Sequence, residues 1–128
     1  MSRRGPIPRK AFDVALPVAQ ARGFVTCCSR GRGSVCDFVI LAAEYTAVVL
    51  VLPSRRLHGT LTEMEGQAGE AVARLRLVPA GHCRTRELWV CSQYGGIRFF
   101  RILDRGLIEL DRNGNPIPGV TGTTGDTG

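Results

Sequence analysis

One apolar run restricts the fold of this chain more than any other feature of the sequence. Residues 46–52 read TAVVLVL, and the side chain is apolar at almost every position. A strand with one face in water alternates apolar and polar residues, whereas a strand covered on both faces is apolar throughout. The run is much too short to cross a bilayer. It therefore predicts a central strand in a sheet that is covered by helices.

Two segments with helical periodicity lie on either side of a group of strands. Apolar residues recur at helical spacing over residues 9–22, where Pro17 predicts a kink or a restart, and again over residues 60–77. Thr60 and Glu63 have the spacing of a capping box. Strand-like runs occupy residues 24–28, 36–43, 46–52, 87–92 and 97–103, with a short further run at 107–110. The order is helix, three strands, helix and two strands, which predicts a mixed sheet with helices on its faces.

The chain is basic, and its positive charge comes almost entirely from arginine. It has 17 basic and 11 acidic residues, a net charge of +6, and Lys10 is its only lysine. Arginine is always charged and binds phosphate through two parallel hydrogen bonds. A basic chain favours a polyanionic partner, above all nucleic acid. A second explanation, a GC-rich genome together with solubility, fits the same composition and stays open.

The cysteines indicate a reducing compartment. The first residues, MSRRGPIPRK, lack the apolar core of a signal peptide. An odd number of cysteines without a secretion signal favours buried, reduced thiols in a soluble cytoplasmic protein that has no membrane partner. No CxxC pair points to structural zinc, and no motif marks His58 or His82 as the base of a cysteine nucleophile. The five cysteines are Cys27, Cys28, Cys36, Cys83 and Cys91.

Four short motifs follow one another in an order that resembles a known family. They are ARGFV at residues 21–25, SRGRGS at 29–34, CDFVI at 36–40 and LWVCSQYGGIRFFR at 88–101. Together they resemble the archaeal Holliday-junction resolvases, a branch of the restriction-endonuclease-like PD-(D/E)xK superfamily. The resemblance implies an α/β fold of the order α-β-β-β-α-β-β, with a mixed central sheet flanked by helices. It covers residues 9–103, which we expect to form the domain, after a basic arm at 1–8 and before a mostly disordered extension at 104–128.

The resemblance places Asp37 on the aspartate with which the family holds its catalytic metal. Active members add the glutamate of a Glu-x-Lys element on the next strand, because magnesium requires oxygen ligands. That element falls here on Leu50-Val51-Leu52, or one residue later, and neither register holds a carboxylate or a lysine. The helix glutamate of the family falls near Phe12, and Asp13 lies about 100° further around the helix. We therefore expect Asp37 to be a vestigial or partial catalytic residue and at most a weak metal ligand. We expect no cofactor, except magnesium if nuclease activity is retained.

Two other interpretations of Asp37 stay open. Another element could supply the missing ligand; the candidates are Glu44, Glu63 and Glu65, with Arg55 in place of the lysine. Alternatively, Asp37 is a structural aspartate at the start of a strand and hydrogen-bonds the loop amides of residues 31–34.

Basic residues near the expected site predict contacts with DNA phosphates. Arg30, Arg32 and Ser34 belong to the glycine-arginine loop, and Arg55 and Arg56 follow the apolar strand. Phosphate contacts of this kind position DNA without reading its sequence. The alternative interpretation of the loop is an exposed, flexible connection.

The last predicted strand pair carries most of the aromatic residues. Trp89, Phe99 and Phe100 are better explained as core than as platforms for base stacking. Adjacent residues of a strand point to opposite faces, so one of the two phenylalanines is left to be covered by the C-terminal tail or by a second subunit. Related resolvases are symmetric dimers, and we therefore expect a homodimer with an apolar patch near Phe99 or Phe100. Arg98 and Arg101 point to opposite faces, so at most one of them joins a basic surface.

These observations favour one function and leave two alternatives. The favoured function is a nuclease-derived nucleic-acid-binding or accessory protein that is catalytically inactive and has DNA as its partner. The first alternative is a magnesium-dependent, structure-specific endonuclease of the Holliday-junction resolvase type with an unconventional site. The second is a protein-interaction module on the same scaffold.

Overall fold

The apolar run forms the third strand of a six-stranded sheet. The computed structural model describes residues 9–28, 36–54, 59–92 and 96–117 of the chain. Its elements are α1 (Arg9–Arg22), β1 (Phe24–Cys27), β2 (Phe38–Leu41), β3 (Thr46–Ser54), α2 (Leu61–Gln67), α3 (Gly69–Leu75), β4 (Arg84–Ser92), β5 (Ile97–Ile102) and β6 (Leu107–Leu110). The strands lie side by side in this order, and all neighbours are antiparallel except β3 and β4, which are parallel. The described chain is a mixed α/β structure.

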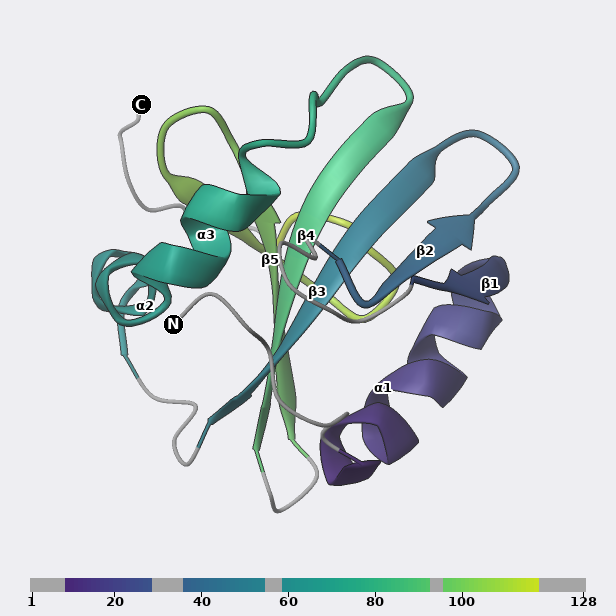
Figure 1. Ribbon diagram of the computed structural model, residues 1–128, viewed down its shortest axis with the longest axis horizontal. Coiled ribbons are helices and arrows are strands. Elements are labelled where there is room, and N and C mark those ends of the chain that lie inside the picture. The colour runs from purple at the N-terminus through teal and green to yellow at the C-terminus, as the bar shows by residue number, and fades with distance from the viewer. Residues whose placement is uncertain (1–8, 29–35, 55–58, 93–95, 118–128) are drawn as a thin grey trace.

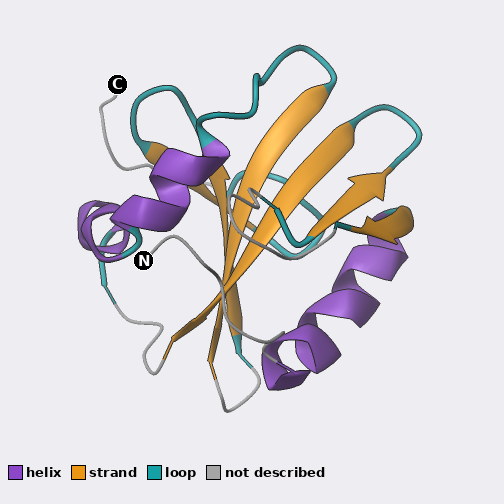
Figure 2. Cartoon of the chain, in the orientation of Figure 1, coloured by secondary structure: helices purple, strands orange, loops and turns teal. Residues whose placement is uncertain are grey.

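Helices cover both faces of the sheet, as Figures 1 and 2 show. α1 packs on one face, where Val49 and Val51 of β3 join its core cluster. α2 and α3 pack on the other face, where Val48 and Leu50 point. Because β3 fills two cores with alternate residues, it has to be apolar throughout, and the predicted central strand is confirmed. None of the helices in the described ranges has the length and apolar character needed to span a membrane.

The first predicted helix is confirmed, and the second is broken in two. α1 has the predicted bounds and includes Pro17, which is exposed. Thr60 and Glu63 form the predicted capping box at the start of α2, with hydrogen bonds of 3.1 and 2.9 Å. The backbone departs from helical geometry at Ala68, with φ −100° and ψ 24°, before α3 begins. Glycines on both sides of Ala68 each lower helix stability by about 1 kcal/mol, which explains the break.

The fourth strand begins earlier than the sequence predicts. We expected a loop up to Arg86, but the parallel ladder of β3 and β4 runs from the pair Thr46↔Arg84 to the pair Ser54↔Ser92. Arg86 is buried within this ladder, and backbone carbonyl oxygens accept the hydrogen bonds of its guanidinium group. Arg86, which the sequence placed in a loop, can therefore be buried because carbonyl groups satisfy its guanidinium group.

The chain after β5 adds an edge strand and a turn to the sheet. β6 pairs with β5, although we placed it in the C-terminal extension at 104–128. In the turn that follows, Oδ1 of Asp111 accepts the backbone N–H groups of Asn113 and Asn115 at 2.8 and 3.0 Å. Gly114 at the tip has φ +90°, a conformation that favours glycine. The expected basic arm at 1–8 and the last part of the extension, 118–128, lie outside the described residues.

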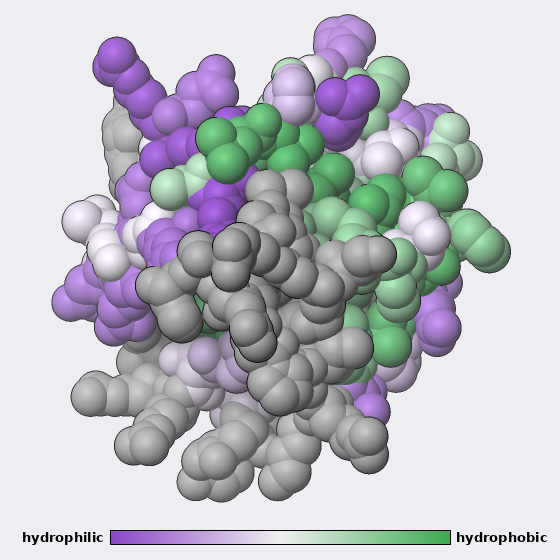
Figure 3. All heavy atoms as spheres, in the orientation of Figure 1, coloured by the Kyte–Doolittle hydropathy of each residue, from purple (hydrophilic) through white to green (hydrophobic). Residues whose placement is uncertain are grey.

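Phe99 and Phe100 do not form the exposed patch that we expected. Phe99 is buried in the cluster beneath α1, and Phe100 in the cluster beneath α2 and α3, because both faces are covered. Trp89 is also core, as predicted, and its ring lies 4.8 Å from that of Phe99. Among the described residues, the exposed large apolar side chains are those of Phe24, Leu41, Leu77 and Leu103. Phe24 and Leu41, which are 70% and 46% exposed, form a cross-strand pair. Figure 3 shows hydrophobic residues gathered on the side of the molecule where β1 and β2 lie.

Candidate functional site

Asp37 lies just before β2 and is buried against β3. Its Oδ2 accepts the backbone N–H of Val51 at 2.7 Å, and its own N–H donates to the carbonyl oxygen of Val49 at 2.7 Å. Its carbonyl oxygen accepts the N–H of Cys28 at 2.9 Å. The carboxylate therefore serves β3 as an additional acceptor, while the backbone of Asp37 bonds both β3 and the residue after β1. The amides of residues 31–34, to which we had expected Asp37 to bond, lie outside the described residues.

The described side chains around Asp37 do not fit a magnesium site. Leu50 and Val51 stand where the second carboxylate would be required, and both are buried in the apolar clusters. On α1, Phe12 is buried while Asp13 is exposed. Within the described residues, no three His, Cys, Asp or Glu side chains are grouped as metal ligands. Magnesium is held by an octahedron of oxygen atoms, which these side chains do not provide.

The described candidates for a replacement ligand have other places in the structure. Glu44 is exposed in the turn after β2, about 13 Å of strand away from Asp37. Glu63 is held in the capping box of α2. Glu65 forms an ion pair of 3.0 Å with Arg76. The structure therefore does not bring these carboxylates to Asp37.

The predicted phosphate-binding residues lie outside the part of the chain that the structure describes. They are Arg30, Arg32, Ser34, Arg55 and Arg56. They remain predictions from the sequence.

Cys28 and Cys36 form a disulfide, whereas we expected reduced thiols. Cys28 follows β1 and Cys36 precedes β2. The antiparallel register, continued by one pair, places Cys28 opposite Asp37, so that Cys36 is its diagonal neighbour with the Cα atoms of the two cysteines 6.3 Å apart. This distance lies in the normal range for a disulfide. The spacing in the sequence did not reveal the pair, because it depends on the register of the hairpin. Among the other cysteines, Cys27 and Cys83 are exposed, and Cys91 is buried.

Burial, with a smaller contribution from the charge of Asp37, raises the pKa of the Cys91 thiol to about 12. The thiol thus stays protonated in the folded protein while it ionises near its ordinary value in the unfolded chain. The resulting stability is fully present below about pH 9 and is lost as the pH rises towards 12, with a limiting slope of about 1.4 kcal/mol per pH unit. When chemical denaturation is measured across this pH range, the free energy of unfolding should decline less steeply with pH for Cys91→Ala than for the parent. Equal slopes would contradict the assignment.

A buried ion pair joins the end of α1 to β4. The guanidinium group of Arg22 binds both carboxylate oxygens of Glu87, at 2.9 and 2.8 Å, and the two side chains are only 4% and 1% exposed. Burial opposes the charge of Arg22, but the hydrogen bonds and charge of Glu87 outweigh this effect and raise its pKa above the ordinary value. The indole N–H of Trp89 donates to Oε1 of Glu87 at 2.9 Å, and the hydroxyl of Thr85 donates to Oε2 at 3.4 Å. All acceptor positions of the carboxylate are therefore used.

Two adjoining hollows open beside this ion pair, at the start of β4, and we call them together the β4 recess. Their volumes are about 270 and 380 Å³, and they share His82, Thr85 and Arg101. The smaller hollow is also lined by Arg22, Tyr45, Glu87, Asn113, Gly114 and Asn115, and the larger by Ala80, Gly81, Arg84, Arg86, Ile102, Leu103 and Asp104. The recess is therefore lined mainly by polar and cationic side chains.

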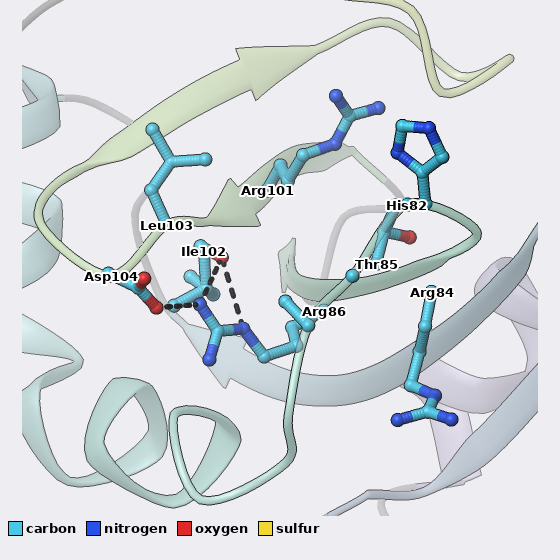
Figure 4. A pocket seen from close by; sticks show the side chains of 10 residues that line it. His82, Arg84, Thr85, Arg86, Arg101, Ile102, Leu103 and Asp104 are labelled. Atoms are coloured by element: carbon cyan, nitrogen blue, oxygen red, sulfur yellow. Dashed lines mark hydrogen bonds and ion pairs between the residues drawn. The ribbon is translucent and has the colours of Figure 1, made fainter.

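Arg86 forms a wall of the recess (Figure 4). It donates two hydrogen bonds to the carbonyl oxygen of Ile102, at 3.2 and 3.0 Å, and one to that of Val78 at 3.1 Å. Its ion pair with Asp104 measures 3.2 Å. In Figure 4, Arg101 extends to the same side of β4 as His82, whereas Arg84 extends away from both. Arg86 thus holds the surrounding loops in place, while Arg101 lines the open part.

The sequence did not point to this recess. Arg22 and Glu87 lie 65 positions apart, and nothing in either motif links them. The available signal was a glutamate at the start of a run as apolar as LWVC, which indicates a buried carboxylate in need of a partner. We predicted that Arg98 and Arg101 face opposite sides, and their surroundings agree: Arg98 binds Glu109, while Arg101 lies in the recess.

Comparison of the chain with models of protein families, with curated protein sequences and with solved structures gave no match in any of the three. The case for a function therefore depends on the residues themselves.

Proposed function

We propose that this chain is a nucleic-acid-binding or accessory protein, derived from a restriction-endonuclease-like nuclease, that does not cleave phosphodiester bonds. The observation that carries the proposal is the use of the Asp37 carboxylate. It accepts a hydrogen bond from β3 and stands beside hydrocarbon where a nuclease of that type has a second acid and a lysine.

The arrangement of the elements supports the proposed ancestry. A helix precedes three antiparallel strands, and a helical crossover then leads from β3 to its parallel neighbour β4. This is the order that the resemblance to the archaeal resolvases implies. It differs in the break of the crossover helix and in the additional strand β6.

The charge of the chain supports a polyanionic partner. The sequence has a net charge of +6. Several arginines, including Arg84, Arg105 and Arg112, are exposed. In the proposal, Arg30, Arg32, Arg55 and Arg56 contact phosphates. Contacts of this type provide affinity for nucleic acid without sequence preference.

Binding to labelled four-way junctions and duplexes, measured by fluorescence anisotropy over a range of salt concentrations, tests the proposal. If these four arginines each neutralise one phosphate, the logarithm of the association constant falls with the logarithm of salt at a slope of about −3.6. Arg55→Gln/Arg56→Gln should lower the magnitude of the slope by about 1.8. Arg74→Gln is the matched control, because Arg74 already pairs with Glu70 of its own helix and its loss should leave the slope nearly unchanged. Absence of binding at low salt would refute the proposal.

The same samples decide between binding and cutting. After incubation with magnesium or manganese, we expect the DNA to remain intact for the parent and for Asp37→Asn alike. A product that is formed by the parent and lost in Asp37→Asn would establish the endonuclease alternative and refute the proposed loss of cleavage.

One observation favours a second role in protein association. The paired residues Phe24 and Leu41 expose apolar surface at an edge of the sheet. We propose this surface, in place of Phe99 or Phe100, as the contact of the expected homodimer. Sedimentation equilibrium of the parent and of Phe24→Ser tests it, and a monomeric parent would exclude the dimer.

A further inference from the structure

Arg101 has an incomplete set of partners within the described structure. Its Nη2 donates to the carbonyl oxygen of Gly114 at 3.1 Å, while its Nε is buried and donates to no described residue. Buried polar groups are nearly always hydrogen-bonded, so an exception needs a partner such as an ion, a water molecule or a ligand. Arg101 also lines both hollows of the β4 recess.

The nearest carboxylate does not supply this partner. Glu87 is the cross-strand neighbour of Arg101, but its oxygens are already bound by Arg22, Trp89 and Thr85. Arg22 and Glu87 neutralise each other, so the positive charge of Arg101 is left over. A charge that is partly removed from water without a counter-charge is unfavourable. An anion in the recess would supply the missing charge.

The other groups of the recess suit an oxyanion. His82 and Thr85 line both hollows, and Asn113 and Asn115 add amide groups to the smaller one. Arginine binds phosphate with paired N–H donors, and amide and imidazole N–H groups can donate to further oxygens. The carboxylate of Glu87 does not repel such an anion strongly, because Arg22 compensates its charge.

The size of the recess selects the kind of phosphate. Hollows of about 270 and 380 Å³ hold a group no larger than a nucleotide, so a continuous duplex cannot enter. A backbone phosphodiester would meet the exposed arginines outside, whereas a phosphate at a chain end can reach inward to Arg101. A terminal phosphomonoester also carries nearly two negative charges at neutral pH, against one for a phosphodiester.

We propose that the β4 recess binds a phosphomonoester, with Arg101 as its principal ligand and His82 as an additional one. The phosphate can belong to the end of a nucleic-acid strand or to a small phosphate ester. The first of these ligands rests on the proposed function, and the second does not. Asp37 contacts β3 at Val49 and Val51, and it lines neither hollow of the recess. The recess is therefore distinct from the proposed remnant of a nuclease site at Asp37.

Two titrations of the full chain distinguish these sources. The first compares short single-stranded oligonucleotides of one sequence that carry a 5′-phosphate, a 3′-phosphate or only hydroxyl ends. The second follows thermal unfolding as inorganic phosphate or a mononucleotide is added. Both use the parent, Arg101→Gln, Arg101→Lys and, as the control, Arg112→Gln, which removes an exposed arginine that lines neither hollow. His82→Ala changes an exposed residue and keeps the test valid if Arg101→Gln does not fold.

We expect one phosphorylated end to bind about 10-fold more tightly than the hydroxyl end. This preference should vanish in Arg101→Gln, weaken in Arg101→Lys and His82→Ala, and persist in Arg112→Gln. If the oligonucleotides bind equally but inorganic phosphate or the mononucleotide stabilises the parent and not Arg101→Gln, the site is supported with a small ester as its ligand. If no nucleic acid binds and this stabilisation remains, the proposed function fails while the phosphate site stands. Equal binding of all ends together with no effect of phosphate would overturn the site.

Discussion

Replacing Glu87 with glutamine should lower the free energy of unfolding by about 3–5 kcal/mol, because removal of one partner leaves a buried charge without compensation. Arg22 is the charge in question, with a side chain that is 4% exposed. The change to glutamine removes the negative charge that balances Arg22 through two hydrogen bonds, and it leaves the size of the side chain nearly unchanged. Urea denaturation of the parent and the variant, followed by circular dichroism, measures the difference.

A double variant separates the loss of the pair from the loss of one charge. Arg22→Met/Glu87→Leu removes both charges and fills the space with apolar atoms, and such replacements are often close to neutral. We expect it to recover most of the stability lost in Glu87→Gln. A double variant as unstable as the single one would show that the four hydrogen bonds of the carboxylate, and not the unpaired charge of Arg22, cause the effect.

Arg86→Ala should lower the free energy of unfolding by about 3 kcal/mol, because it leaves buried carbonyl groups without donors and removes the packing of a long side chain. The side chain of Arg86 is 3% exposed, and its loss affects the carbonyl oxygens of Ile102 and Val78. The ion pair with Asp104 contributes little, because that carboxylate is 96% exposed. Thermal and urea denaturation provide the measurement.

Arg84→Ala is the matched control for Arg86→Ala. Arg84 lies two residues earlier in the same strand, is exposed, and donates one hydrogen bond to the carbonyl oxygen of Pro79. We expect its replacement to change stability by less than about 0.5 kcal/mol. Similar losses of stability for the two variants would mean that any arginine at the start of β4 contributes equally, and would contradict the specific role assigned to Arg86.

Local patterns in the sequence were sufficient for most of the fold. The apolar run at residues 46–52 predicted a strand with two covered faces, and Thr60 and Glu63 predicted a helix start, because both signals depend on near neighbours. The start of β4 was missed for the opposite reason. Its first residues are polar, and only the ladder with β3 and the carbonyl partners of Arg86 make them a buried strand.

The candidate sites divide in the same way. Asp37 was found because a short motif and its position before a strand mark it, but its hydrogen bond to Val51 depends on the register of two strands. The disulfide between Cys28 and Cys36 depends on the same register. The β4 recess combines α1, the loop before β4, β5 and the turn after β6, and no local pattern can bring such distant segments together.

The close packing of the turn after β6 limits which residues of the recess can be substituted to change its ligand. Gly114 presses its backbone against Arg22, and a Cβ atom there would lie 2.6 Å from Nη2 of that arginine. A side chain at position 114 would therefore require Arg22 or the turn to move, in addition to adopting a backbone conformation that favours glycine. Ligand preference is better changed at the rim, where His82 and Asn115 are exposed and take no part in the described hydrogen bonds of Glu87.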